Sequence, residues 1–156
     1  MAEAAEREPA DPRRSLLAAG LIGVGVTAAV DEIVFHQLLA WHHFFDRSTS
    51  AVALFSDGLL HSAELIILVL GFFMLADVRA RRALASTSAW AGFFIGAGGF
   101  QLFDGIVDHK VLRLHQVRYV DNLLPYDLAW NGAGLLLLAV GFVLLRRARA
   151  ERAPGR

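Results

Sequence analysis

Histidine and aspartate recur at one spacing in two places along this chain. The segment DEIVFHQLLAWH starts at Asp31, and the segment DGIVDHKVLRLH starts at Asp104. Both follow the pattern Asp-x-Ile-Val-x-His-x-x-x-x-x-His. Imidazole and carboxylate groups are nitrogen and oxygen donors of metal sites, and inside a membrane they also serve as proton relays. We therefore interpret these two histidine segments as the part of the chain that carries its chemistry.

Composition restricts that chemistry and places it in a membrane. The chain has 156 residues, of which 56% are apolar, and it has no cysteine. The lack of cysteine excludes thiolate ligands, disulfides and iron–sulfur clusters held by this chain. Apolar runs of roughly 20 residues are long enough to cross the hydrocarbon core of a bilayer. Four such runs, at 15–39, 56–76, 84–107 and 128–145, predict an all-α, integral membrane four-helix bundle.

The chain also resembles itself beyond the two histidine segments. SDGLLHS, starting at Ser56, is followed by LGFF, and it aligns with YDLAWNG, starting at Tyr126 and followed by VGFV. These matches predict two tandem two-helix repeats, at about 15–80 and about 84–147, related by a pseudo-twofold axis along the membrane normal. We therefore expect the first aspartate and histidine of each segment to approach their counterparts across the bundle.

Arginine placement predicts the orientation in the membrane. Eleven of the 15 basic residues lie before the first predicted span, between the second and third, or after the fourth. Because cytoplasmic loops are enriched in Lys and Arg, we expect both termini in the cytoplasm and both histidine segments near the outer side of a bacterial inner membrane. The segment 1–14 is predicted to be a disordered cytoplasmic tail, and 148–156 a basic cytoplasmic tail. The four-span domain then covers 15–145.

Ionisable residues inside the predicted spans are the candidate ligands. A charged group in hydrocarbon costs about 2.5–3.5 kcal/mol, so such groups indicate a functional role. Helical spacing groups some of them, since Asp57 and His61 stand at i and i+4 on one helix face. His42, His43 and His115, at or beyond the ends of the spans, are more simply explained as solvated residues of the interface. The expected metal ligands are His36, His61, His109, Asp31, Glu64 and Asp104. Further candidates are Glu32, Asp57, Asp108, His115, Asp127 and Asn131.

Several functions are compatible with such a site. Histidine and carboxylate donors without sulfur suit Cu, Zn or Fe, which predicts a role in metal handling or metal-dependent redox chemistry. Haem held by two histidines is a less favoured use of the same residues. The main alternative is a small proton-coupled or ion carrier with Glu64, Asp31 and Asp104 as relay groups. In a third interpretation the groups pair with one another and only hold the helices together. No motif in the sequence identifies an enzymatic reaction.

Four motifs carry a resemblance to a known family. They are VDEIVFHQLLxWHH near the first span, SDGLLH at the start of the second, FDGIVDHKVLxLHQ at the end of the third and YDxxWN at the fourth. Over about residues 15–145, the chain resembles a family of small four-span bacterial membrane proteins known as domain of unknown function 2243. The resemblance implies four spans and a polar cluster, without a particular reaction. The expected partners are the lipid bilayer and either another membrane protein or a second copy of the chain, and no nucleic acid is expected.

Overall fold

The structure is a computed structural model that describes residues 9–153. Two π-helical segments, η1 and η2, continue α1 and α3 without a break. The predicted tails 1–14 and 148–156 lie partly outside the described residues. The described parts of both tails are partly helical, because α1 begins at Pro12 and α4 continues to Ala150. The elements in chain order are α1 Pro12–Val30, η1 Asp31–Leu38, α2 Ser50–Ala80, α3 Ser86–Leu102, η2 Phe103–Val111 and α4 Leu124–Ala150.

Capping residues decide where the first two long helices begin. The Asp11 side chain accepts a hydrogen bond from the Arg14 backbone N–H at 3.0 Å, and a proline follows it in the first turn. Thr49 caps α2 in the same way by accepting from Val52 N–H at 3.4 Å. A side-chain oxygen at this position satisfies an N–H that the helix itself leaves unpaired. These helices therefore begin earlier in the chain than the apolar runs from which we predicted them.

Four helices are long and apolar enough to cross a membrane. They have 26 to 31 residues each, and about 20 suffice for the hydrocarbon core. The prediction of an all-helical protein with four candidate membrane spans is therefore confirmed. Each histidine segment begins inside the last turns of a span and continues into the loop beyond it. The spans are Pro12–Leu38, Ser50–Ala80, Ser86–Val111 and Leu124–Ala150.

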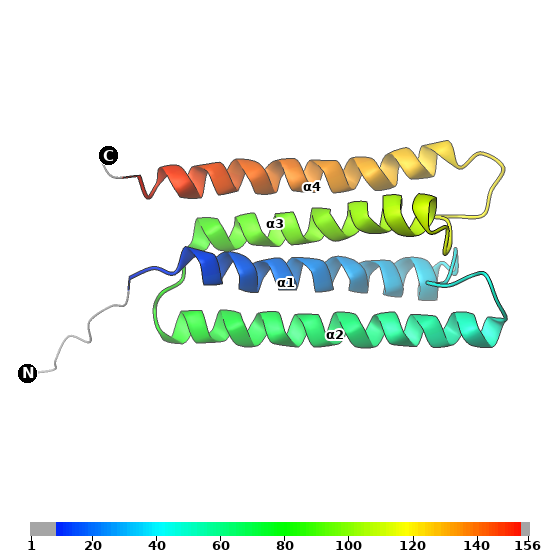
Figure 1. The fold of residues 1–156 in the computed structure, drawn as a ribbon, viewed down its shortest axis with the longest axis horizontal. Coiled ribbons are helices and arrows are strands. Elements are labelled where there is room, and N and C mark those ends of the chain that lie inside the picture. Colours follow the sequence, from blue (N-terminus) through cyan, green and yellow to red (C-terminus); the bar gives the residue numbers. More distant parts are fainter. Residues whose placement is uncertain (1–8, 154–156) are drawn as a thin grey trace, which may run out of the picture.

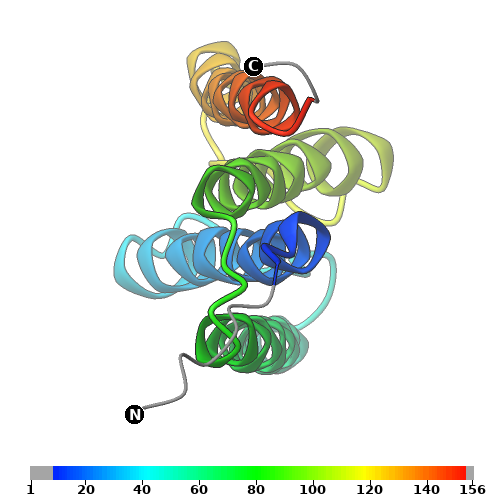
Figure 2. The same cartoon turned by 90° about the vertical axis from the view of Figure 1, so that its left-hand side faces the viewer.

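The helices form an open row rather than a closed bundle. They lie side by side in the order α2, α1, α3, α4, and the central neighbours α1 and α3 run in one direction while α2 and α4 run in the opposite direction (Figure 1). α1 packs on α2 and α3, and α3 packs on α4, whereas α2 and α4 make no contact with each other within the described part of the chain. Figure 2 shows this row from the end at which α1 starts and α4 ends. The central pair, α1 and α3, therefore carries the two histidine segments at the opposite end.

Glycines bring α1 and α3 into backbone contact. A Cβ atom placed on Gly92 of α3 would overlap the backbone carbonyl of Leu16 in α1. One turn further, a Cβ on Gly96 would overlap the carbonyl of Gly20. Small residues that permit such close approach are the usual basis of helix pairing in membranes, where the hydrophobic effect between helices is weak. This contact fixes the relative position of the two helices that carry the histidine segments.

The backbone takes the same local form at the end of both central helices. Leu39 N–H donates to the carbonyl five residues earlier at 2.9 Å, and Leu112 N–H does so at 2.7 Å. Each helix then ends in a residue with positive φ, Ala40 at 49° and Arg113 at 54°. Such conformations are rare outside glycine and tend to occur at functional sites. The correspondence supports the predicted internal repeat, which stays a prediction.

Candidate metal centre

The π-helical segments explain how aspartate and histidine come to share one face. In a π-helix each N–H bonds to the carbonyl five residues earlier, so residues five apart lie close to one another along the axis. Asp31 and His36 have this spacing in η1, and His36 Nε2 lies 3.5 Å from Asp31 Oδ2. Asp104 and His109 have it in η2, and His109 Nε2 lies 3.2 Å from Asp104 Oδ2. The wide turn therefore places each aspartate against the first histidine of its segment.

The chain turns back after each π-helix and carries a second histidine into the row. Ala40 and Arg113, with their positive φ, form these turns. Beyond them, His42 is 3% exposed and His115 is 2% exposed. The prediction that His42 and His115 are solvated at the membrane interface is therefore wrong, because the turns direct both side chains between the central helices.

Four imidazole rings form one buried group, which we call the four-histidine cluster. The ring centroids of His36 and His42 are 4.5 Å apart, and those of His109 and His115 are 4.6 Å apart. Across the centre, His42 and His115 stack at 4.6 Å. The remaining cross pairs are His36 with His115 at 5.9 Å and His42 with His109 at 6.0 Å. The two histidine segments thus meet between α1 and α3, as their sequence similarity led us to expect.

Each aspartate faces both histidines of its own segment. The second oxygen of Asp31, Oδ1, lies 3.8 Å from His42 Nε2. In the other half, Asp104 Oδ1 lies 3.4 Å from His115 Nε2. Both aspartates are 2% exposed. Two carboxylates and four imidazoles therefore direct their donor atoms into one buried volume.

Hydrogen bonds at the other ring nitrogen fix the tautomer of two cluster histidines. His42 Nδ1 donates to the backbone carbonyl of Val117 at 2.9 Å, and His115 Nδ1 donates to that of Phe44 at 2.9 Å. A carbonyl only accepts, so Nδ1 carries the proton and Nε2 of the neutral ring keeps its lone pair. Burial, followed by the nearby His115, lowers the pKa of His42 to about 2, so this ring stays neutral. A neutral ring with a free Nε2 is the form that binds metals.

The Nε2 atoms that face the centre of the cluster have no hydrogen-bond partner among the described residues. This applies to His36, His42, His109 and His115 alike. Buried polar atoms in proteins are nearly always hydrogen-bonded, so a group of unpaired donor atoms requires an explanation. A bound cation provides one, because the Nε2 lone pairs of His42 and His115 would then have a partner.

Two further carboxylates hold His36 from the opposite side. His36 Nδ1 lies 2.8 Å from Glu32 Oε2 and 3.1 Å from Asp57 Oδ1. Asp57 also accepts from His43 Nδ1 at 2.6 Å and from the Phe44 backbone N–H at 2.8 Å. Carboxylates in this position orient a ligand histidine and increase its basicity. Glu32 and Asp57, both predicted as further ligands, therefore face His36 Nδ1, and the three residues form one more group whose donor atoms lie within 4.8 Å of one another.

The second half lacks that carboxylate support. Gly105 follows Asp104 where Glu32 follows Asp31, and His109 Nδ1 has no partner among the described residues. In compensation, the indole N–H of Trp130 donates to Asp104 Oδ2 at 2.9 Å. The two halves therefore present similar donors to the centre with different surroundings.

Several predicted residues lie outside the four-histidine cluster. The side chain of His61 is 56% exposed and lies 2.6 Å from Glu64, and neither residue belongs to the groups of donor atoms that lie within 4.8 Å of one another in the described part of the chain. α2 is an outer helix of the row, so its histidine faces away from the centre. Asp127 pairs with Lys110 at 2.7 Å. Asn131 donates to the Asp127 backbone carbonyl at 2.9 Å, and Asp108 is buried in η2.

The donor spacing is close to what an ion requires. His36, His42 and His115 each offer a ligand atom within 4.8 Å of the others, and so do Asp104, His109 and His115. Donors on opposite sides of a transition-metal ion, each at about 2.0–2.2 Å, are about 4 Å apart. Small movements of the side chains would therefore bring three or more donors to bonding distance.

Comparison with known proteins agrees with the membrane assignment. A family model described as "Predicted membrane protein (DUF2243)" matches residues 18–148. No match was found among curated proteins or among solved structures.

Proposed function

We propose a function for this chain, which belongs to the DUF2243 family of predicted membrane proteins: it holds a transition-metal ion inside the membrane-spanning helices. The ligands would be the four-histidine cluster and the two aspartates that face it. This set differs from the leading ligands predicted from the sequence by including His42 and His115, of which His115 was a further candidate, and by omitting His61 and Glu64. The proposed ligands are His36, His42, His109, His115, Asp31 and Asp104.

The observation that carries the proposal is the group of four unpaired, buried Nε2 atoms. If the cluster served only to join the helices, we would expect its histidines to donate and accept within it. Instead, the Nδ1 atoms of His42 and His115 are bonded to backbone carbonyls outside the cluster. These bonds leave the Nε2 lone pairs directed at one another and at two carboxylates, an arrangement that is unfavourable without a cation.

The donor set favours a first-row transition metal. Imidazole suits Zn, Cu and Fe, whereas Mg²⁺ and Ca²⁺ prefer sites made of oxygen atoms alone. Carboxylates beside the histidines add negative charge, which stabilises a divalent or trivalent ion. The proposed role is therefore metal handling or metal-dependent redox chemistry in the membrane, with Cu, Zn and Fe as the metals to test.

The spacing of the rings favours a bare ion over haem. Stacked imidazoles with centroids 4.6 Å apart occupy the centre of the cluster. In a haem held by two histidines, the iron and the porphyrin plane lie between the two imidazole rings, so the stacked rings of His42 and His115 would have to separate. The close contact of α1 and α3 through Gly92 and Gly96 also leaves little room for a flat macrocycle below the cluster.

The distribution of ionisable residues along the helices favours a resident metal centre over a carrier. From Leu65 to Leu75, α2 has no ionisable residue, and the same holds for α4 from Gly132 to Leu145. A carrier requires polar groups along a route through both leaflets. The histidines and the carboxylates that face them gather instead at one end of the row.

Elemental analysis of the full chain purified in detergent tests the proposal, together with an absorption spectrum of the same sample. We expect a stoichiometric transition metal without a Soret band. The His109→Ala variant should contain only background metal. Metal at background in the wild-type protein after loading with Cu, Zn and Fe in turn would overturn the proposal, and a Soret band would assign the histidines to haem.

A further inference from the structure

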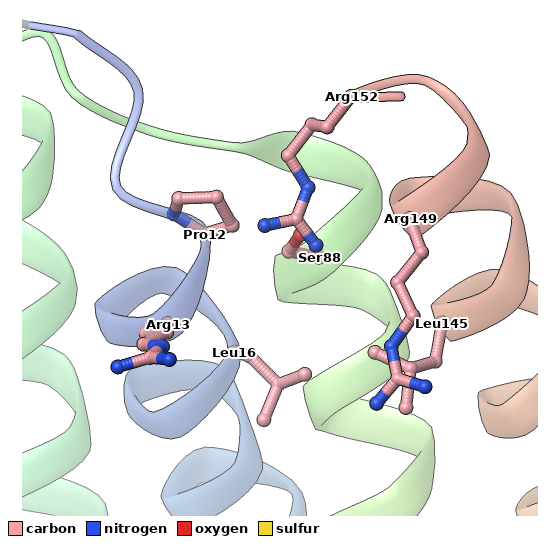
Figure 3. Close-up of a pocket in the computed structure, with 7 residues that line it drawn as sticks. All are labelled: Pro12, Arg13, Leu16, Ser88, Leu145, Arg149 and Arg152. Atoms are coloured by element: carbon pink, nitrogen blue, oxygen red, sulfur yellow. The ribbon is translucent and has the colours of Figure 1, made fainter. Parts of the chain in front are cut away.

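A basic cavity lies at the end of the row opposite the four-histidine cluster. It has a volume of about 410 Å³ and is bounded by the start of α1, the start of α3 and the last turns of α4. Figure 3 shows three arginines around the cavity. Arg13 belongs to α1, Arg149 belongs to α4, and Arg152 follows the end of α4. Three guanidinium groups around one cavity indicate an anionic ligand, because arginine binds phosphate and carboxylate oxygens with several parallel N–H groups.

The charges of these arginines are not neutralised by nearby carboxylates. Among the described residues, the side chains of Arg13 and Arg149 make no hydrogen bond or ion pair, and Arg152 donates through Nε to the Ala148 carbonyl. The neighbouring acids are engaged elsewhere, since Glu151 pairs with Arg147 at 3.1 Å and Asp77 with Arg14 at 3.1 Å. The cavity therefore keeps a net positive charge.

A buried hydroxyl adds a neutral donor to the cavity. Ser88, in the first turn of α3, is 2% exposed and lines the cavity. None of the described residues forms a hydrogen bond with its side chain. Figure 3 shows Ser88 between the α1 and α4 sides of the cavity. A hydroxyl in this position could complete the coordination of an anion that the arginines attract.

The inner wall of the cavity is apolar. Leu16 follows Arg13 by one turn of α1, and Leu145 precedes Arg149 by one turn of α4. In both helices the leucine lies closer to the middle of the membrane than the arginine does. A ligand that fits both walls has an anionic head and a hydrocarbon part directed into the bilayer. A free phosphate ion would use only the outer wall.

We propose that this cavity binds the phosphate headgroup of an anionic phospholipid, with Arg13, Arg149 and Ser88 as its principal contacts. Clusters of basic residues at the ends of membrane helices attract anionic lipids, and pockets between helices give such contacts a defined site. The proposal concerns a site remote from the four-histidine cluster and does not depend on metal binding.

The test compares lipids on the full chain purified in detergent, by native mass spectrometry and thermal unfolding. Phosphatidylglycerol should bind and raise Tm more than phosphatidylcholine does. The Arg13→Gln/Arg149→Gln variant should bind phosphatidylglycerol about 25-fold more weakly, at about five-fold for each arginine removed. Arg146→Gln is the matched control, because Arg146 lies on the same helix, is exposed and does not line the cavity.

Three results would overturn the proposal. One is equal binding of phosphatidylcholine and phosphatidylglycerol. A second is a loss in the Arg146→Gln control as large as that in the double variant. A third is a Tm increase with inorganic phosphate that equals the increase with phosphatidylglycerol, which would assign the cavity to a soluble anion. The double variant should retain its metal content, so the outcome is independent of the proposed metal centre.

Discussion

The imidazole rings of His42 and His115 lie parallel, with an angle of 6° between their planes and centroids 4.6 Å apart. Each comes from the loop that follows a central helix, and each donates to a carbonyl of the other loop, that of Val117 or Phe44. The two loops are also joined by a bond from Asp46 N–H to the Leu114 carbonyl at 3.1 Å. The loops therefore hold each other in the position that brings the histidines to the cluster.

Replacement of His42 or His115 by alanine should abolish metal retention. Either change removes one proposed ligand and also one of the hydrogen bonds that join the loops. We expect the metal content measured by elemental analysis to fall to background in both variants. His61→Ala is the matched control, since His61 lies on the outer helix with a 56% exposed side chain, and it should keep the wild-type metal content. Loss in the control, or retention by His42→Ala, would contradict the ligand set.

Hydropathy was sufficient to predict the four spans, because each contains a long apolar stretch with few charged residues. It could not predict the open row, since this depends on which helices make contact. Asp57 and His61 show the consequence. Their i and i+4 spacing placed them on one helix face, but α2 packs against α1 and η1 and turns His61 outwards.

The sequence held one signal for His42 that we did not use. The repeated pattern includes His42 and His115 at the same position, so the two residues should have been treated alike. We instead extrapolated the first helix as a straight α-helix, which placed His42 at the interface. The π-helical turn and the positive φ of Ala40 redirect the chain, and neither is evident from hydropathy.

Glu32→Gln should weaken metal binding without abolishing it. Glu32 lies 2.8 Å from His36 Nδ1 and would orient the ring as a charged acceptor. Loss of such a partner typically lowers metal affinity about 10–100-fold. Competition with a chelator of known affinity measures the change. Asp127→Asn serves as the control, because the Asp127 carboxylate pairs with Lys110. The metal affinity of this variant should differ from that of the wild type by less than about threefold. Equal losses in both variants would indicate a general effect of charge.

Gly96→Val should destabilise the protein through the contact of α1 and α3. Its side chain would overlap the Gly20 carbonyl, so the helices would have to separate. Overpacking of this kind costs about 1–3 kcal/mol or more, and Tm falls by roughly 2–4 °C per kcal/mol for a chain of this size. In the control Gly99→Val, also in α3, the new side chain meets no atom within 4 Å of its Cβ position. Thermal unfolding in detergent should therefore show the loss for Gly96→Val alone, and similar Tm values for both variants would contradict this packing.

Labelling of single cysteines should reveal which side of the membrane the histidine loops face. The chain has no cysteine, so each introduced thiol is the only one available in it. Ser48→Cys and Asn122→Cys place an exposed thiol in the two loops near the cluster, and Ala80→Cys places one at the opposite end of α2. Because the arginines gather at the opposite end, a membrane-impermeant maleimide added to intact cells should label the two loop variants and leave Ala80→Cys unlabelled until the membrane is opened. The reverse pattern would put the metal centre near the cytoplasm, and it would mean that the arginine asymmetry does not determine the orientation of this protein.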